Sequence, residues 1–249
     1  MEFHVVCDLN IHGAKSKPYK MSLSALQDEI EISYDAEVGD GQPPCMHEQF
    51  TGKCIPYIDL DLVEGGEKTF GNYAKFRKKK IAELRKAIKK VFGDDVNVIL
   101  ADRSGHSVKH EAYKLSLRAF IRGAGYFSCP PACGFFMKTN FNKIEGIDLD
   151  AYKKRQNMGL VYNTKMGDPR ILQLLNAKDN LIEWKFRAHA TAEFGATIIQ
   201  NVEGEEKCLD GDWVETSDTA YQVVADLGGG EGGGAIDRVL HAAKSLMPD

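Results

Sequence analysis

The chain has 249 residues and a net charge of −4; 43% of its residues are hydrophobic and 27% are charged. These values are typical of a globular protein with a buried core, and they exclude a strongly basic composition over the whole chain. Because no apolar run approaches the ~20 residues of a membrane-spanning helix and the first residues show no signal-peptide pattern, we expect a soluble, intracellular protein with no membrane partner.

The first clear elements follow a turn-rich segment at residues 39–45, since residues 1–50 show only weak alternation. Residues 54–62 are mostly apolar and predict a strand. Residues 71–92 repeat apolar side chains at helical spacing, and Gly93 suits the end of that helix. The sequence therefore predicts a strand followed by a long amphipathic helix.

Further along, residues 96–102 predict a buried strand and residues 113–121 a strand with strict alternation. Residues 123–136, with two consecutive prolines, predict a loop-forming insertion. An extended segment is expected at residues 144–149, and short helical segments follow it. Those helical segments are residues 151–156 and 170–176.

The order of these elements predicts the fold class. Strands and helices mix without a regular βαβ rhythm, which favours an α+β fold over a doubly wound sheet. Residues 226–237 are rich in glycine and indicate a hinge, followed by a short amphipathic tail. We therefore expect one catalytic or binding domain at residues 1–225, with hinge and tail at residues 226–249.

Two acidic residues, Asp59 and Asp61, stand two apart in the predicted strand of residues 54–62. Side chains alternate between the two faces of a strand, so both carboxylates lie on one face, with Cα atoms about 7 Å apart. Carboxylates at this spacing suit Mg²⁺ or Mn²⁺, and without a cation they repel each other. A solvated strand face is the alternative for this pair alone. An EF-hand is excluded, because Val63 and Glu64 stand where a ligand and a glycine are needed.

Two later segments add residues of complementary chemistry. On the predicted strand 113–121, Ser116 and Arg118 share a face, and a hydroxyl beside a guanidinium is a plausible phosphate cradle, although an exposed face is the commoner arrangement. In residues 146–165, Asp148 is placed to complete a carboxylate triad, and Asp150 is an N-cap candidate for a helix from Ala151. Lys165 closes a locally basic stretch, for which a solvated helix face is the alternative.

Taken together, these motifs resemble the archaeo-eukaryotic primase superfamily, most of all the primase-polymerases and the primase domains of large DNA virus primase-helicases. The first motif is the acidic pair in "KCIPYIDLDL", the second is "KLSLR", and the third is "IDLDAYKKRQNMGLVYNTK". Their order and spacing match over roughly residues 45–175. Arg118 stands where the family usually has histidine, and Gln156 and Gly159 stand where basic residues are common, with Arg155 and Arg170 as possible substitutes.

The resemblance implies a primase-type catalytic core with an RNA-recognition-like antiparallel sheet flanked by helices. It implies that Asp59, Asp61 and Asp148 are catalytic and hold two Mg²⁺ or Mn²⁺ ions. It assigns nucleotide binding, at the triphosphate, to a second set of side chains. These are Ser116, Arg118 and Lys165.

The same resemblance implies the partners. They are a single-stranded DNA template, nucleoside triphosphates, and a helicase module on the same chain or in complex. The location would be the nucleus, the cytoplasm or a viral replication compartment. Template-backbone contacts are assigned to the basic start of the helix at residues 71–92, although a solvated face is the usual meaning of such a run. These residues are Arg77, Lys78, Lys79 and Lys80, with His106 and His110 as weaker candidates for template or nucleotide contacts.

The expected function is template-directed nucleotidyl transfer, as a DNA primase or primase-polymerase. A metal-dependent nuclease using the same carboxylates and a nucleic-acid-binding module with a decayed nucleotide site are the alternatives. An intracellular location favours free thiols for the six cysteines. A zinc site drawn from Cys45, Cys54, Cys129 and Cys133 is less favoured, because their spacing is not that of a zinc knuckle.

Overall fold

A computed structural model describes residues 2–7, 18–35, 43–65, 70–165, 167–183 and 194–213. All helices and strands discussed below belong to one compact unit, Met1–Gly211. The predicted boundary at residue 225, the glycine-rich hinge and the amphipathic tail lie outside the described residues. They remain predictions.

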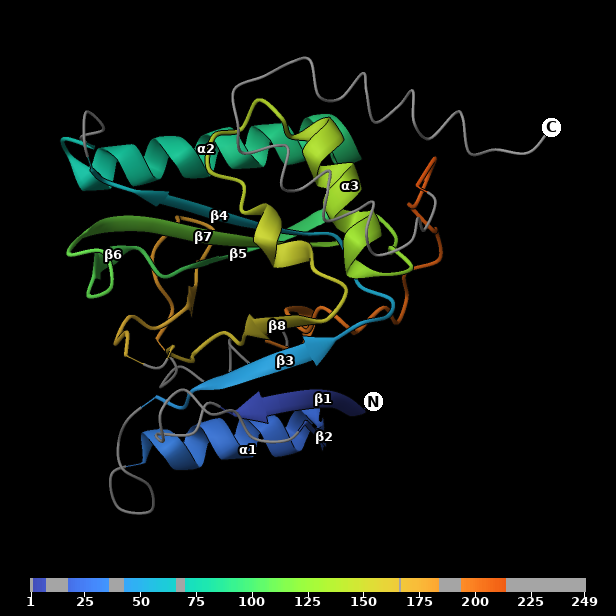
Figure 1. The fold of residues 1–249 in the computed structure, drawn as a ribbon, viewed down its shortest axis with the longest axis horizontal. Helices are drawn as coiled ribbons and strands as arrows, with labels where there is room; N and C mark the ends of the chain where they lie inside the picture. The colour runs from blue at the N-terminus through green and yellow to red at the C-terminus, as the bar shows by residue number, and fades with distance from the viewer. Residues whose placement is uncertain are drawn as a thin grey trace, which may run out of the picture. The chain divides into compact units, whose positions relative to one another are not determined.

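The first of two antiparallel sheets is built mainly from the N-terminal part of the chain (Figure 1). Its strand order is β2-β1-β3-β8. The helix α1 follows β2 directly, and the Ser22 side chain accepts a hydrogen bond from the backbone N–H of Ala25 at its start. The elements are β1 (Glu2–Cys7), β2 (Tyr19–Ser22), α1 (Leu23–Tyr34), β3 (Met46–Phe50) and β8 (Gln156–Gly159).

The second sheet has the order β4-β7-β5-β9, with the short β6 paired to β7. Every pairing in it is antiparallel. The strands are β4 (Tyr57–Val63), β5 (Asn97–Asp102), β6 (Gly105–Ser107), β7 (Ala112–Arg122) and β9 (Gln173–Leu174). The helical elements that follow its strands are α2 (Tyr73–Phe92), α3 (Pro130–Asn140) and the 3-10 helix η1 (Leu149–Tyr152).

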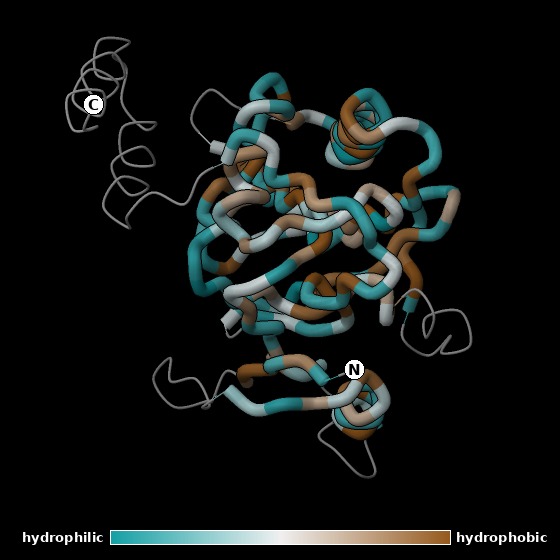
Figure 2. Tube along the Cα trace, turned by 90° about the vertical axis from the view of Figure 1, so that its right-hand side faces the viewer, coloured by the Kyte–Doolittle hydropathy of each residue, from teal (hydrophilic) through white to brown (hydrophobic). Residues whose placement is uncertain are grey.

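The second sheet lies between two layers. In Figure 1, α2 and α3 cover one face, and β3 and β8 of the first sheet lie on the other side. The α2 side chains that face the sheet are Ile81, Leu84 and Ile88, all with 0% exposure. Figure 2 views α2 nearly end-on, with hydrophobic and hydrophilic residues both present in its turns. The helical spacing of Ile81, Leu84 and Ile88 gives α2 an apolar stripe toward the core.

The strongly periodic predictions are confirmed. The strand β7 and the strand β5 fall within one residue of the predicted ranges, and β4 covers most of the predicted strand. The predicted long helix is α2, which begins after the capping side chain of Asn72 and ends at Gly93. The α+β class is also confirmed, as two antiparallel sheets with few helices.

Three other predictions are wrong. Much of the predicted loop at residues 123–136 is α3. Pro130 and Pro131 occupy its first turn, where backbone N–H groups make no helical hydrogen bond, so the missing N–H of proline costs nothing. Residues 170–176 contain β9 instead of a helix, since this segment pairs with β5 at Ala101 and Asp102. The helical segment expected at residues 151–156 is η1, which ends at Tyr152, and β8 follows it.

Among the helices that the structure describes, none is long and apolar enough to cross a membrane.

Candidate functional site

The pairing of β4 with β7 aligns the polar side chains of both strands on one face of the second sheet. Asp59 is opposite Arg118, and Asp61 is opposite Ser116. The intervening residues of β4, Ile58 and Leu60, have 0% exposure and face the helical layer. The predicted alternation of the carboxylates against the apolar side chains is therefore confirmed, and each acid meets a polar partner across the ladder.

Asp148 joins this face from a part of the chain almost ninety residues later. The segment before η1 forms an antiparallel bridge between Ile147 and Leu60, on the side of β4 away from β7. The N–H of Asp148 donates to the carbonyl of Asp59 at 2.8 Å, and the N–H of Asp61 donates to the carbonyl of Gly146 at 2.8 Å. This register places Asp148 directly beside Asp59, with both side chains on the same face.

The close approach of this segment depends on Gly146. Its φ is +96°, which side-chain-bearing residues rarely adopt. A Cβ atom there would lie 2.6 Å from Cγ of Leu62 and 3.1 Å from the carbonyl oxygen of Asp61. Both the backbone conformation and the contact with β4 therefore require glycine two residues before Asp148.

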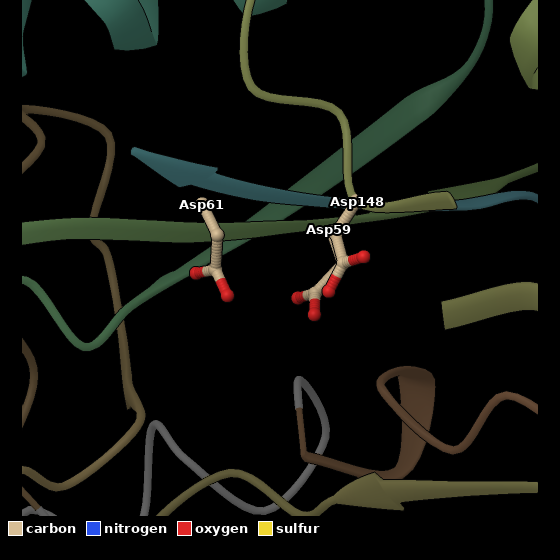
Figure 3. A group of neighbouring side chains, drawn as sticks. All are labelled: Asp59, Asp61 and Asp148. Carbon is tan, nitrogen blue, oxygen red and sulfur yellow. The ribbon is translucent and has the colours of Figure 1, made fainter. Parts of the chain in front are cut away.

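The three aspartates form one cluster (Figure 3). One carboxylate oxygen of each lies within 4.8 Å of those of the other two, and Figure 3 shows the carboxyl groups extending from the sheet to the same side. Asp59 is buried, and Asp61 and Asp148 are half-buried. Three carboxylates at this separation form an oxygen-ligand set of the kind that Mg²⁺ and Mn²⁺ bind.

Basic side chains partly neutralise the cluster. Arg118 donates from Nε to Oδ1 of Asp59 at 2.9 Å, and Nζ of Lys114 lies 2.6 Å from Oδ2 of Asp61. The second oxygen of Asp61, Oδ1, is buried and has no hydrogen-bond partner within the described residues. A buried carboxylate oxygen without a partner is costly, and a bound cation would satisfy it. The aspartates therefore fit a divalent metal.

The pKa values of two of these carboxyl groups move in opposite directions. Burial acts to raise the pKa of Asp59, but the charge and hydrogen bond of Arg118 outweigh it, and the pKa is lowered. The pKa of Asp148 is raised, first by burial and then by the negative charge of Asp59. Asp59 is thus held as a carboxylate, and a cation beside Asp148 would offset the negative charge of Asp59.

Asp148 also caps η1, and this corrects one prediction. Its Oδ1 accepts the backbone N–H of Asp150 at 2.9 Å, so the N-cap is Asp148 and not Asp150. Asp150 is exposed and lies 3.2 Å from the Lys153 ammonium. The cap fixes the orientation of the Asp148 carboxyl group, which is useful for a metal ligand.

A second basic group, Arg103, lies on the same face and was not predicted from the sequence. It follows β5, and its backbone N–H donates to the carbonyl of Ser116, which places it beside Ser116 in the sheet. Arg103 is only 4% exposed, and its buried Nε has no hydrogen-bond partner within the described residues. Burial, and then the charge of Arg118, lower the pKa of Arg103. No sequence motif marks it, because its position depends on the β5–β7 register.

The other predicted phosphate contacts occupy this region too. Ser116 is 4% exposed on β7, between Asp61 and Arg103. Lys165 is exposed as a residue, but desolvation of its ammonium, followed by repulsion from Arg103, lowers its pKa to about 8. The charges of Asp59 and Asp61 oppose that shift. Arg170, named as a substitute phosphate contact, is instead bound to Asp168, and Arg155 is exposed.

The four basic residues assigned to template binding differ in their surroundings. Arg77 is bonded to Asp102 of β5 and to the carbonyl of Asp179. The Lys80 side chain is 8% exposed and lies 3.1 Å from Glu83. Only Lys78 and Lys79 of the four are exposed. His106 and His110 are exposed near the β6–β7 connection.

A buried acid in the first sheet was also missed. Glu48 of β3 is 1% exposed, and its carboxylate accepts the backbone N–H groups of Ile199 and Gln200 at 2.9 and 2.6 Å. Burial raises the pKa of Glu48 to about 7, although the two N–H donors and the charge of Arg118 act against it. Glu48 therefore ties β3 to a turn more than 150 residues away.

The cysteines do not assemble with the carboxylates. None of the six forms a disulfide, and Cys54 and Cys133 are fully buried. Within the residues that the structure describes, the aspartate trio is the one cluster of three or more potential metal-ligating side chains. The zinc alternative, drawn from the four cysteines named above, therefore has no assembled ligand set.

Comparison with known proteins adds no family to this description. A scan against models of protein families gives no match, and a search of curated proteins also finds none.

Proposed function

We propose that the protein is a template-directed nucleotidyltransferase of the primase-polymerase type. The observation that carries this proposal is the convergence of Asp59, Asp61 and Asp148 on one side of the sheet, where a buried oxygen of Asp61 finds no partner among the described residues. Basic groups that suit phosphate lie on the same face. The motif order along the chain, which resembles that of the archaeo-eukaryotic primases, supports the same function.

The aspartates would hold two Mg²⁺ or Mn²⁺ ions, which would activate the attacking hydroxyl oxygen and neutralise the leaving pyrophosphate. The chain's own contribution is to fix the ligands. Asp59 and Asp61 are set by the β4–β7 ladder, and Asp148 by its bridge to β4 and its cap of η1. Ligands held by backbone pairing keep their spacing without a bound ion, which is the preorganisation that such chemistry requires.

The phosphates of an incoming nucleotide would bind beside the carboxylates. Arg103 offers a buried Nε–H with no acceptor within the described residues, and Ser116 lies between it and Asp61. Lys165 adds a cation near the same acids. A site with acids for a divalent ion and unsatisfied donors for an anion has the complementary chemistry of a metal–triphosphate complex.

The finer parts of the proposal rest on the resemblance and on local charge. The second sheet would be the RNA-recognition-like sheet of a primase-type core. A single-stranded DNA template would contact the exposed Lys78 and Lys79 of α2 through its phosphates, which makes binding salt-sensitive. A helicase module would act with this domain, on the same chain or in complex.

The test is primer synthesis on a bare single-stranded DNA template, with Mg²⁺ or Mn²⁺ and all nucleoside triphosphates. We expect products that require both template and metal, and none from Asp59→Ala. Asp150→Asn is the matched control, because Asp150 is exposed, close to Asp148 in sequence, and outside the cluster. It should retain synthesis.

The alternatives predict other results in the same assay. Degradation of labelled DNA with Mn²⁺ and no nucleotides would indicate a nuclease. DNA binding that survives Asp59→Ala, without synthesis by the parent chain under any condition, would indicate a binding module and would contradict the proposed function.

A further inference from the structure

Arg118 is held by the protein on two sides. It is 3% exposed, its Nε donates to Oδ1 of Asp59 at 2.9 Å, and its Nη1 donates to the backbone carbonyl of Gly159. A guanidinium withdrawn from water is stable only when it is well paired, and these two acceptors supply that pairing. Two of its nitrogens are therefore already committed to the protein.

The two acceptors belong to different sheets. Asp59 is on β4 of the second sheet, directly opposite Arg118, whereas Gly159 ends β8 of the first sheet and pairs with His47 of β3. In Figure 1, β8 lies on the side of the second sheet away from α2. Arg118 thus connects the Asp59 carboxylate on β4 to Gly159 at the end of β8 in the other sheet.

The basic residues around the carboxylates are not equivalent. Arg103 has a buried Nε with no partner within the described residues, and Lys165 is exposed with a pKa lowered to about 8. Both have capacity for an incoming anion. Arg118 instead uses its Nε to bind Oδ1 of Asp59 and its Nη1 to bind the backbone carbonyl of Gly159.

We propose that Arg118 is a positioning residue, which orients the Asp59 carboxylate and ties β7 to β8, and that it does not bind the nucleotide. This inference rests on the proposed function for its kinetic part, whereas the tie between the sheets stands without it. It replaces the role in triphosphate binding that the sequence resemblance gives to position 118.

Two consequences separate this role from a phosphate contact. Loosening Asp59 lowers the rate of the chemical step and leaves ground-state nucleotide binding unchanged, so kcat falls while KM stays constant. The second consequence concerns β8. Loss of the Arg118–Gly159 hydrogen bond releases β8 from β7, so its amides exchange faster, which loss of a phosphate contact alone would not cause.

The experiment uses the full chain with Arg118→Lys, which keeps the charge but loses the planar fork, and Arg118→Gln, which loses both. Lys165→Gln is the comparison for a lost phosphate contact. Three quantities are measured: Mn²⁺ affinity by electron paramagnetic resonance, affinity for a fluorescent nucleoside triphosphate, and steady-state synthesis. Hydrogen exchange of the β8 amides gives a fourth readout that needs no activity.

For Arg118→Lys we expect kcat to fall about tenfold or more, with KM and nucleotide affinity within about threefold of the parent. Exchange of the β8 amides should become faster in both Arg118 variants. Lys165→Gln should weaken nucleotide binding and leave β8 exchange unchanged.

Nucleotide affinity that falls in Arg118→Lys as far as in Lys165→Gln would overturn the inference. Unchanged β8 exchange in Arg118→Lys would overturn it as well, whatever the activity. If the parent chain binds Mn²⁺ and nucleotide but makes no product, the proposed function fails, and the affinity and exchange measurements still decide the role of Arg118. If Arg118→Gln does not fold, Arg118→Lys decides between the two roles.

Discussion

The two faces of the second sheet share the same strands and have opposite chemistry. Toward α2, alternate residues of β4 and β7 are apolar and fully buried, as at Leu60 and Leu115. On the other face, the residues between them are acids, a serine and an arginine that meet across the ladder. One face thus contributes hydrophobic stabilisation, and the other holds buried charge that is stable only because it is paired.

The comparison indicates where we expect a ligand to bind. The α2 face is lined by apolar side chains, whereas on the polar face Oδ1 of Asp61 and Nε of Arg103 are buried with no hydrogen-bond partner within the described residues. A fold gains nothing from such groups, because each costs roughly 1–3 kcal/mol when buried and unpaired. Ligand binding at this face is the physical reason that we give for both.

The largest expected effect is on the polar face. Asp61→Asn should reduce synthesis by about 10³-fold or more, comparable to loss of a central electrostatic group in other active sites. It should also abolish the rise in melting temperature that Mn²⁺ gives the parent chain. Asp94→Asn, at an exposed aspartate paired with Lys89, is the control and should change neither quantity. If the Asp61→Asn variant is active, Asp61 is not a ligand of a catalytic metal.

On the opposite face, Leu84→Ala should lower the free energy of unfolding by about 2–5 kcal/mol, because Leu84 of α2 is fully buried and its truncation leaves a cavity. Urea denaturation measures the loss. Below the melting temperature, Mn²⁺ affinity of the folded protein should stay within about threefold of the parent, since the cluster lies across the sheet. A large change in affinity would mean that the two faces are not independent.

The Gly146→Ala variant tests whether the close approach of this segment to β4 positions Asp148. The positive φ and the overlap with Leu62 should cost about 1–3 kcal/mol of stability. The displaced segment should also carry Asp148 away from Asp59, so Mn²⁺ binding should weaken. Gly52→Ala is the matched control, because a Cβ there meets nothing within 4 Å. Equal results for both variants would show that the close approach of the segment does not position Asp148.

The smallest effect concerns pH. Since the pKa of Lys165 is lowered to about 8, its ammonium is charged below that pH and neutral above it. Nucleotide affinity should therefore be constant up to about pH 7 and fall a few-fold as pH rises to 9. Fluorescence titration measures it. Lys165→Arg keeps its charge throughout, and the same pH profile in that variant would contradict the assignment.

The sequence predicted the polar face better than its surroundings. Period-two alternation in residues 54–62 and 113–121 is a local signal, and it was sufficient to place Asp59, Asp61, Ser116 and Arg118 on common faces. The adjacency of Asp148 to Asp59 was expected from the triad suggested by residues 146–165 and from the resemblance to primases, not from a local periodic pattern. Its physical cause, a bridge between Ile147 and Leu60, involves residues far apart in sequence.

The rest depended on contacts that no local pattern shows. The first sheet was not predicted, because β1, β2 and β3 are short and their alternation is weak. Arg103 follows a strand that looks apolar, and only the register with β7 brings it beside Ser116. Glu48 resembles a surface residue in sequence, but the turn at residues 199–200 covers it.

The most direct test of the central claim is coupled binding of Mn²⁺ and a non-hydrolysable nucleoside triphosphate, measured by calorimetry on the parent chain and on the Asp61→Asn, Asp148→Asn double variant. The account predicts that each ligand strengthens binding of the other in the parent, and that Mn²⁺ binding is lost in the double variant. Mn²⁺ binding that is absent from the parent, or equal in the two proteins, would contradict it.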